Sequence, residues 1–124
     1  MKKTDSFSSN VDELELLYKL KKCWSKESSS LWTKENPSKG QCGVTSIVVQ
    51  ELLGGKIMKT RLASGQKHFY NFINGKRIDF TKDQFSIPII YNDMPSSREE
   101  AFLDTNNEQY SFLLTALKKE ILKD

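Results

Sequence analysis

The segment KHFYNFINGKRIDFT restricts the possible folds more than any other stretch of the chain. Two runs of β-prone residues flank Asn74 and Gly75, the residue pair preferred in two-residue type I′ turns. The sequence therefore predicts an antiparallel hairpin, with strands over 68–73 and 76–80.

The predicted register places a histidine and a carboxylate on one face of this hairpin. Tyr70 lies opposite Asp79, and directly paired residues share a face while side chains alternate along each strand. His68 is then a diagonal neighbour of Asp79, within side-chain reach. A carboxylate in this relation fixes the tautomer and orientation of an imidazole. A shift of one residue would move Asp79 to the opposite face, so the contact depends on the turn.

The second strong pattern is an apolar segment behind the polar loop NPSKGQ. Its periodicity predicts a helix over 42–53 that begins with Cys42 and ends at Gly54 and Gly55. The apolar face is formed by Val44, Ile47, Val48, Leu52 and Leu53. A helix with so few polar residues is expected at the centre of the fold.

Three further helical segments are predicted. The first covers about 11–24 and begins after Asn10, which is placed as an N-cap. A helical turn is expected over 99–102, and a last amphipathic helix over about 108–122.

The remaining patterns indicate an α+β fold, in which an antiparallel sheet packs on the central helix. A strand is predicted over 56–62. The apolar segment 86–94 resembles an edge strand, because Pro88 would disrupt a central one. We expect one domain over 1–124, with a loose lead-in over 1–9.

Composition and charge exclude several classes of protein. The 124 residues carry a net charge of +3, and the lysines alternate with acidic residues instead of forming a nucleic-acid-binding patch. No apolar run approaches the roughly 18 to 20 residues that span a membrane. The first residues lack the apolar stretch of a secretory signal. We therefore expect a cytoplasmic protein that binds neither nucleic acid nor membrane, and the sequence does not indicate its oligomeric state.

Cys42 has the setting of a nucleophile. A thiol at a helix N-terminus lies beside unpaired N–H groups and the positive end of the helix dipole, so its pKa is expected to fall below the roughly 8.5 of a free cysteine. The same N–H groups can hold an oxyanion during acyl transfer. Gly43 is expected to leave the thiol uncrowded.

Each candidate residue also has a structural interpretation. A lone cysteine is usually a small core residue, and a lone histidine is often only a hydrogen-bonded structural group. Asp79 could instead pair with Arg77 or cap a turn. His68 is the only histidine in the chain, and its placement beside Asp79 favours a triad of Cys42, His68 and Asp79.

Redox and metal chemistry are not indicated. There is no Cys-x-x-Cys motif, and Cys23 lies on the apolar side of a predicted helix, so a structural role is expected for it. One histidine and two separated cysteines do not make a zinc site. No phosphate loop or dinucleotide fingerprint is present, so we expect no metal and no cofactor.

The block NPSKGQCGVTSIVVQELLGG, followed by HFYN and GKRIDFT, resembles the YunG-like family of small bacterial proteins. The order of a helix-opening cysteine, then histidine and aspartate on antiparallel strands, is also similar to papain-like and transglutaminase-like enzymes. This likeness implies Cys42 as nucleophile, His68 as general base and acid, and Asp79 as the orienting group. Papain-like enzymes use a glutamine six positions before the cysteine as an oxyanion donor. Asn36 occupies that position here and Gln41 adjoins the cysteine, so both are oxyanion candidates.

Two hypotheses for function remain open. The first is a thiol-dependent acyl-transfer enzyme, such as a hydrolase, peptidase, amidase or deamidase, acting on a small molecule or peptide. The second is a binding module that keeps the fold of a cysteine enzyme without its chemistry. The aromatic residues that could line a pocket in either case, or could simply pack in the core, are Trp24, Trp32, Tyr70 and Phe72.

Overall fold

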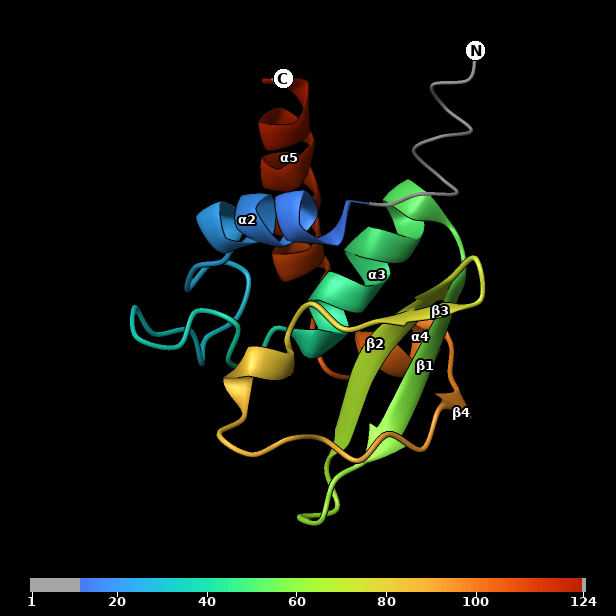
Figure 1. Ribbon diagram of the computed structural model, residues 1–124. Coiled ribbons are helices and arrows are strands. Elements are labelled where there is room, and N and C mark those ends of the chain that lie inside the picture. The colour runs from blue at the N-terminus through green and yellow to red at the C-terminus, as the bar shows by residue number, and fades with distance from the viewer. Residues whose placement is uncertain (1–11, 124) are drawn as a thin grey trace.

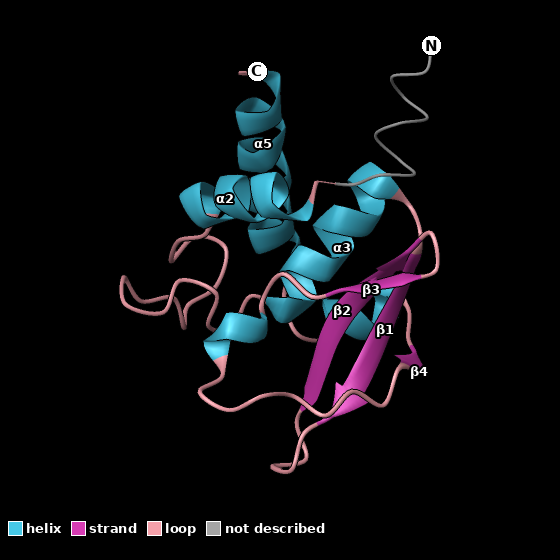
Figure 2. Ribbon diagram, in the orientation of Figure 1, coloured by secondary structure: helices cyan, strands magenta, loops and turns pink. Residues whose placement is uncertain are grey.

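The computed structural model describes residues 12–123, so the expected lead-in over 1–9 and the expected N-cap Asn10 lie outside the described residues. In the described part, the helices are α2 (Glu13–Cys23), α3 (Cys42–Leu53), α4 (Arg98–Phe102) and α5 (Asn107–Leu122), with a short 3₁₀ turn η1 (Lys82–Gln84). The strands are β1 (Lys56–Arg61), β2 (Lys67–Ile73), β3 (Lys76–Ile78) and β4 (Met94–Pro95). Figure 1 shows the course of the chain, and Figure 2 shows the helices on one side of the sheet.

The four strands form one antiparallel sheet in the order β3-β2-β1-β4. The predicted hairpin register is confirmed, since Ile73 pairs with Lys76 across the turn. Asn74 and Gly75 have φ values of 54° and 76°, as a type I′ turn requires at both central positions.

The second hairpin strand is shorter than predicted. The ladder ends at the pair between Asn71 and Ile78, so the expected pair between Tyr70 and Asp79 does not form. The chain turns away from the sheet here because the Asp79 carboxylate accepts the Thr81 N–H at 3.1 Å. The following side chain, Phe80, is then buried in the main hydrophobic core.

Helix α3 lies against the sheet, and the α+β prediction with this helix at the centre is confirmed. Eight of its residues, from Cys42 to Val49, are buried. The Asn71 side chain ties β2 to the helix by donating to the Ser46 carbonyl at 3.0 Å. Helices α2 and α5 pack on the side of α3 away from the sheet, as Figure 1 shows. The main core between these helices includes Leu20, Val44, Val48, Leu113 and Leu117.

The start of the first helix and the extent of one edge strand differ from the predictions. In both places a side chain accepts a backbone N–H group. Helix α2 begins at Glu13, where Asp12 caps it by accepting the Glu15 N–H at 3.1 Å. The predicted edge strand over 86–94 is mostly irregular, and only Met94–Pro95 pairs with β1. At the end of β1, the Arg61 N–H donates to the Asn92 side chain instead of to a neighbouring strand.

The other predicted elements agree with the structure within one or two residues. The last helix begins at Asn107, capped by Asn106. The helical turn expected over 99–102 is α4. None of the helices within residues 12–123 is long and apolar enough to cross a lipid bilayer.

Candidate functional site

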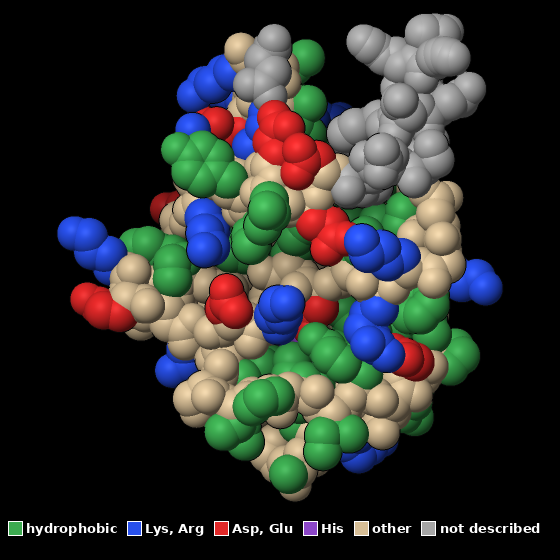
Figure 3. Space-filling view, in the orientation of Figure 1, with side chains coloured by type: hydrophobic (Ala, Val, Ile, Leu, Met, Phe, Trp, Pro, Cys, Tyr) green, Lys and Arg blue, Asp and Glu red, His purple; other side chains and the backbone are tan. Residues whose placement is uncertain are grey.

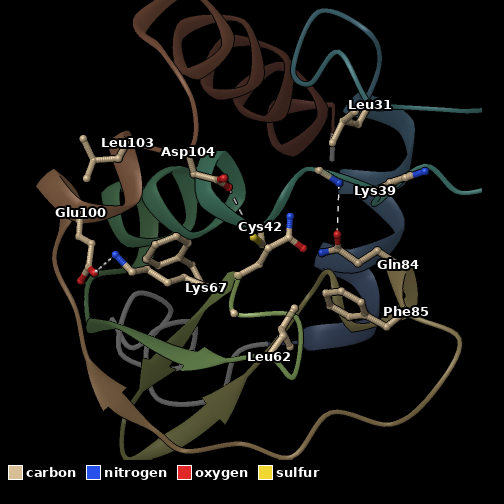
Figure 4. Close-up of a pocket in the computed structure, with 14 residues that line it drawn as sticks. Leu31, Lys39, Cys42, Leu62, Lys67, Gln84, Phe85, Glu100, Leu103 and Asp104 are labelled. Carbon is tan, nitrogen blue, oxygen red and sulfur yellow. Dashed lines mark hydrogen bonds and ion pairs between the residues drawn. The ribbon is translucent and has the colours of Figure 1, made fainter.

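A cavity of about 540 Å³ opens at the N-terminus of α3. Cys42 lies in its wall with 8% of its surface exposed, as Figure 4 shows. The wall combines apolar and charged residues from five separate segments, among them Lys39, Leu62, Phe69, Gln84, Phe85 and Asp104. This is the cavity in which a nucleophile at Cys42 would meet a substrate, and we call it the Cys42 cavity.

The thiol of Cys42 has two hydrogen-bond partners. It donates to Oδ2 of Asp104 across 3.6 Å, the contact dashed in Figure 4. Its sulfur accepts the backbone N–H of Phe69. That N–H is available because β3 ends opposite Asn71, so the edge of β2 beyond this pair has no strand beside it. The early end of β3 therefore creates the position in which the sulfur lies.

Asp104 also binds the first turn of α3. Its carboxylate accepts the backbone N–H of Gly43. A Cβ on Gly43 would lie 2.7 Å from Cβ of Asp104 and 3.0 Å from the Ala101 carbonyl oxygen. Glycine at this position therefore permits the close approach of Asp104, and does not leave the thiol uncrowded as predicted.

The electrostatics of Cys42 contradict the expected fall in its pKa. Burial, together with the nearby Asp104 carboxylate, raises the thiol pKa to about 12. Burial also raises the pKa of Cys23, to about 11. The prediction of a depressed thiol pKa at Cys42 is therefore wrong for this conformation. The hydrogen bond from the Phe69 N–H lowers the thiol pKa but does not compensate for the loss of solvation and the carboxylate partner.

His68 and Asp79 make the contact predicted from the hairpin. His68 Nε2 lies 2.7 Å from Asp79 Oδ2, and the two side chains are 0% and 3% exposed. The Asp79 carboxylate also accepts the Tyr91 hydroxyl at 2.7 Å and the Thr81 N–H at 3.1 Å. These donors hold the carboxylate in one orientation, and the carboxylate in turn holds the imidazole ring.

The other ring nitrogen of His68 is closed off from solvent. Nδ1 is buried and has no hydrogen-bond partner among the described residues. The ring is packed between Tyr70 and Phe85, with an edge-to-face contact of 5.0 Å between the centroids of His68 and Phe85. An unpaired buried nitrogen costs about 1 to 3 kcal/mol. Such a group is a candidate for a functional role.

Cys42, His68 and Asp79 belong to one electrostatic neighbourhood, which also contains Asp104. The Asp79 charge contributes to the raised pKa of Cys42. Burial raises the pKa of Asp104, while the Cys42 thiol, the Gly43 N–H and the charge of His68 oppose that change. The Cys42 sulfur accepts the N–H of Phe69, the residue after His68, while the thiol donates its own proton to Asp104. The structure thus joins His68 to Asp79 and gives the thiol a partner that the sequence did not indicate.

The two expected oxyanion donors are not in the cavity wall. Asn36 uses its amide to donate to the Gln84 carbonyl at 3.2 Å. Gln41 is fully buried, and neither polar atom of its side chain has a partner among the described residues. Neither residue lines the Cys42 cavity, so in this structure neither side chain is placed to donate to an oxyanion there.

Gln84 is a polar cavity residue that the sequence analysis missed. Its Oε1 accepts the Gly40 N–H at 3.2 Å, which leaves Nε2 buried and without a partner within the described chain. Gln84 and Cys42 both line the cavity in Figure 4. No motif marks this glutamine, and only its place at the end of η1 brings it to the site.

The four aromatic pocket candidates lie elsewhere. Trp24 is in the main core, where its Nε1 donates to Thr45 at 2.9 Å, and Trp32 packs against the same core. Tyr70 is buried on β2, and Phe72 lies between cross-strand neighbours. None of the four lines the Cys42 cavity. For Trp24 and Trp32, packing in the core was the alternative interpretation.

A metal centre has no support in the part of the chain that the structure describes. No group of three or more His, Cys, Asp or Glu side chains there is placed to hold an ion. The two cysteines are both free thiols.

Comparison with known proteins identifies the family. A model described as YunG protein matches residues 12–122. The chain belongs to the YunG family. It is 57% identical over 104 residues to the "Uncharacterized protein YunG" of Bacillus subtilis (strain 168), an alignment that covers 84% of this chain and 90% of that relative. No solved structure matches the chain. Family membership therefore extends over Cys42, His68 and Asp79 but brings no reaction with it.

Proposed function

We propose that this YunG protein is a thiol-dependent acyl-transfer enzyme, in which Cys42 attacks the carbonyl carbon of an ester, thioester or amide. The observation that carries the proposal is the buried His68–Asp79 pair, whose remaining ring nitrogen has no partner among the described residues. The charge of Asp79 acts on Cys42, which lies in a cavity wall. The helix-opening position of the cysteine, with the histidine and aspartate following on an antiparallel hairpin, supports a papain-like or transglutaminase-like arrangement.

The raised pKa of Cys42 determines how the proton moves. With its pKa near 12, the side chain is a neutral thiol at neutral pH, so no stable thiolate–imidazolium pair is present beforehand. When Nε2 carries a proton toward Asp79, Nδ1 has a free lone pair and can act as a base. As the sulfur–carbon bond forms, the S–H bond breaks, and the proton leaves its hydrogen bond to Asp104 and passes from the sulfur to His68 Nδ1.

The rest of the cycle follows from the same two atoms. The protonated Nδ1 donates its proton to the leaving alcohol, thiol or amine, and a thioester remains on Cys42. Water or an acceptor amine attacks this thioester, and His68 takes its proton. The sulfur leaves as thiolate and is reprotonated by the imidazolium, which restores the starting state.

An oxyanion in this cavity needs donors that Asp104 does not already occupy. Gln84 Nε2 is unpaired and belongs to the cavity wall, so it is the side-chain donor we infer. The Phe69 N–H is a second donor, since it becomes free when the sulfur moves to the carbonyl carbon. Both lie on the cavity side of Cys42, whereas Asn36 and Gln41 do not.

Acylation of the intact protein by p-nitrophenyl acetate and related esters and anilides tests the proposal. Mass spectrometry should find one acyl group on Cys42 in the wild type and in Cys23→Ser. His68→Ala should slow acylation by about 100-fold or more, because general-base assistance is lost. If Cys42 acquires no acyl group from any of these donors, or if His68→Ala leaves the rate unchanged, the proposal fails.

One observation favours a second candidate, a binding module without chemistry. The Asp104 carboxylate occupies both the thiol and the first free N–H group of α3, which are the groups an acyl enzyme would use. A binding module would hold its ligand equally well in Cys42→Ala and would show no acylation.

A further inference from the structure

We propose that the acyl group delivered to Cys42 is a linear aliphatic chain, which lies in a groove beside the Cys42 cavity. This inference rests on the proposed function, because it names the class of acyl donor for the same site. The groove has a volume of about 570 Å³ and runs between the β1–β2 turn and the segment after η1. We call it the isoleucine groove, and its apolar lining is formed by Leu62, Ala63, Phe85, Ile87, Ile89 and Ile90.

The isoleucine groove adjoins the Cys42 cavity. Leu62, Gln66 and Phe85 line both of them. In Figure 4, Leu62 and Phe85 lie together on the side of the cavity opposite Leu103 and Glu100. A linear chain can therefore leave the carbonyl at Cys42 and continue over these two side chains into the groove.

Two apolar side chains of the groove are largely exposed. Ile87 is 75% exposed and Ile90 is 85% exposed. Figure 3 shows hydrophobic side chains gathered low in the view, where Figure 1 places the chain between η1 and β4. A gathering of exposed apolar side chains on one part of a small protein is typical of a ligand or partner site.

The side chains of Asn92 and Arg61 in the groove wall already have hydrogen-bond partners, which favours a hydrocarbon chain over a peptide. Asn92 accepts from the Thr60 hydroxyl at 2.6 Å and from the Arg61 N–H at 3.2 Å. The Arg61 guanidinium donates to the Gly65 carbonyl at 3.4 Å. A peptide would bring a donor and an acceptor with every residue, and each would need a partner on burial. An aliphatic chain needs none.

Phe85 connects the groove with the chemistry proposed at Cys42. Its ring packs edge-to-face on His68, with the centroids 5.0 Å apart. A chain that lies on the open side of Phe85 is held next to the residue that moves the proton. The groove would therefore align the carbonyl for attack as well as bind the chain.

Binding of neutral aliphatic amides tests this inference without requiring any reaction. Butanamide, hexanamide and octanamide are titrated into the wild-type chain, and dissociation constants are measured from ¹⁵N–¹H spectra. Each methylene that leaves water is expected to tighten binding about two- to fourfold. Octanamide should accordingly bind about 16- to 250-fold more tightly than butanamide.

Paired variants show whether the gain arises in the groove. In the double variant Ile87→Ser, Ile90→Ser, the ratio of the affinity for octanamide to the affinity for butanamide should fall by at least about fourfold. This fall is equivalent to the loss of one methylene contact. The control double variant Leu14→Ser, Leu122→Ser changes side chains that are equally exposed, at 80% and 81%, and should leave the gain unchanged.

Three outcomes would overturn the inference: equal affinity for all three amides, an equal loss in both double variants, or tighter binding of N-acetylleucinamide than of octanamide. The last compares a peptide-like molecule with a linear chain of the same carbon number. Because these measurements detect binding alone, their failure leaves acylation of Cys42 untouched. Conversely, absence of acylation with intact chain-length dependence would remove the proposed function and keep the groove as a binding site.

Discussion

Replacing Asp104 by Asn isolates the charge that opposes thiolate formation at Cys42. Asparagine has nearly the same shape, and its carbonyl oxygen can still accept from the thiol and from the Gly43 N–H. Burial of the sulfur is therefore retained while the negative charge is removed. We expect the pKa of Cys42 to fall from its value of about 12 in the wild type.

The size of the change follows from the geometry. At the observed Sγ–Oδ2 distance of 3.6 Å, repulsion between thiolate and carboxylate amounts to about 1 kcal/mol in bulk water and about 5 kcal/mol at an effective dielectric constant of 20. At about 1.36 kcal/mol for each pKa unit, the thiol pKa should fall by about 1 to 3. A thiolate loses part of its nucleophilicity as its pKa falls, so alkylation near neutral pH should accelerate by about 3- to 30-fold.

The assay is alkylation of the folded protein by iodoacetamide, with the two cysteines followed separately by peptide mass spectrometry. Cys23 is the internal control, because burial and Glu120 raise its pKa and Asp104 does not contribute. Equal Cys42 rates in wild type and Asp104→Asn across the pH range would show that the carboxylate does not suppress the thiolate. A parallel rise at Cys23 would show that the variant had merely loosened the fold.

Three further predictions concern the surroundings of the site. Gly43→Ala should lower the free energy of unfolding in urea by about 1 to 3 kcal/mol, because the new methyl group would lie 2.7 Å from Asp104. Combining Gly43→Ala with Asp104→Gly should recover part of this loss. The pKa of Glu100 is lowered to about 2, mainly by its hydrogen bond to Lys59. Its contribution to stability is therefore present above about pH 4.5 and is lost as the pH falls toward 2. Glu100→Gln should flatten the pH dependence of unfolding in that window, and an unchanged profile would contradict the assignment. Gly75→Val should destabilise the hairpin by about 1 to 2 kcal/mol in thermal unfolding, since its φ of 76° is unfavourable for a β-branched residue, whereas full stability would mean that the turn tolerates another geometry.

Much of the site was predictable because its residues are close in sequence. His68 and Asp79 are brought together by a two-residue turn whose backbone angles Asn74 and Gly75 favour, and pairing alternation then decides which side chains share a face. The position of Cys42 at a helix start follows from apolar periodicity in the same way. These are local rules, so they were available without knowledge of the tertiary structure.

The sequence by itself determined the α+β class, the hairpin register and the contact between His68 and Asp79. Only the tertiary structure decided the state of the thiol, because its partner Asp104 lies 62 residues further along the chain and arrives through the corner between α4 and α5. The same holds for Gln84 and for the groove at Ile87 and Ile90, which depend on where irregular segments pack. A thiol pKa depends on burial and on every charge nearby in space, and residue spacing along the chain contains neither quantity.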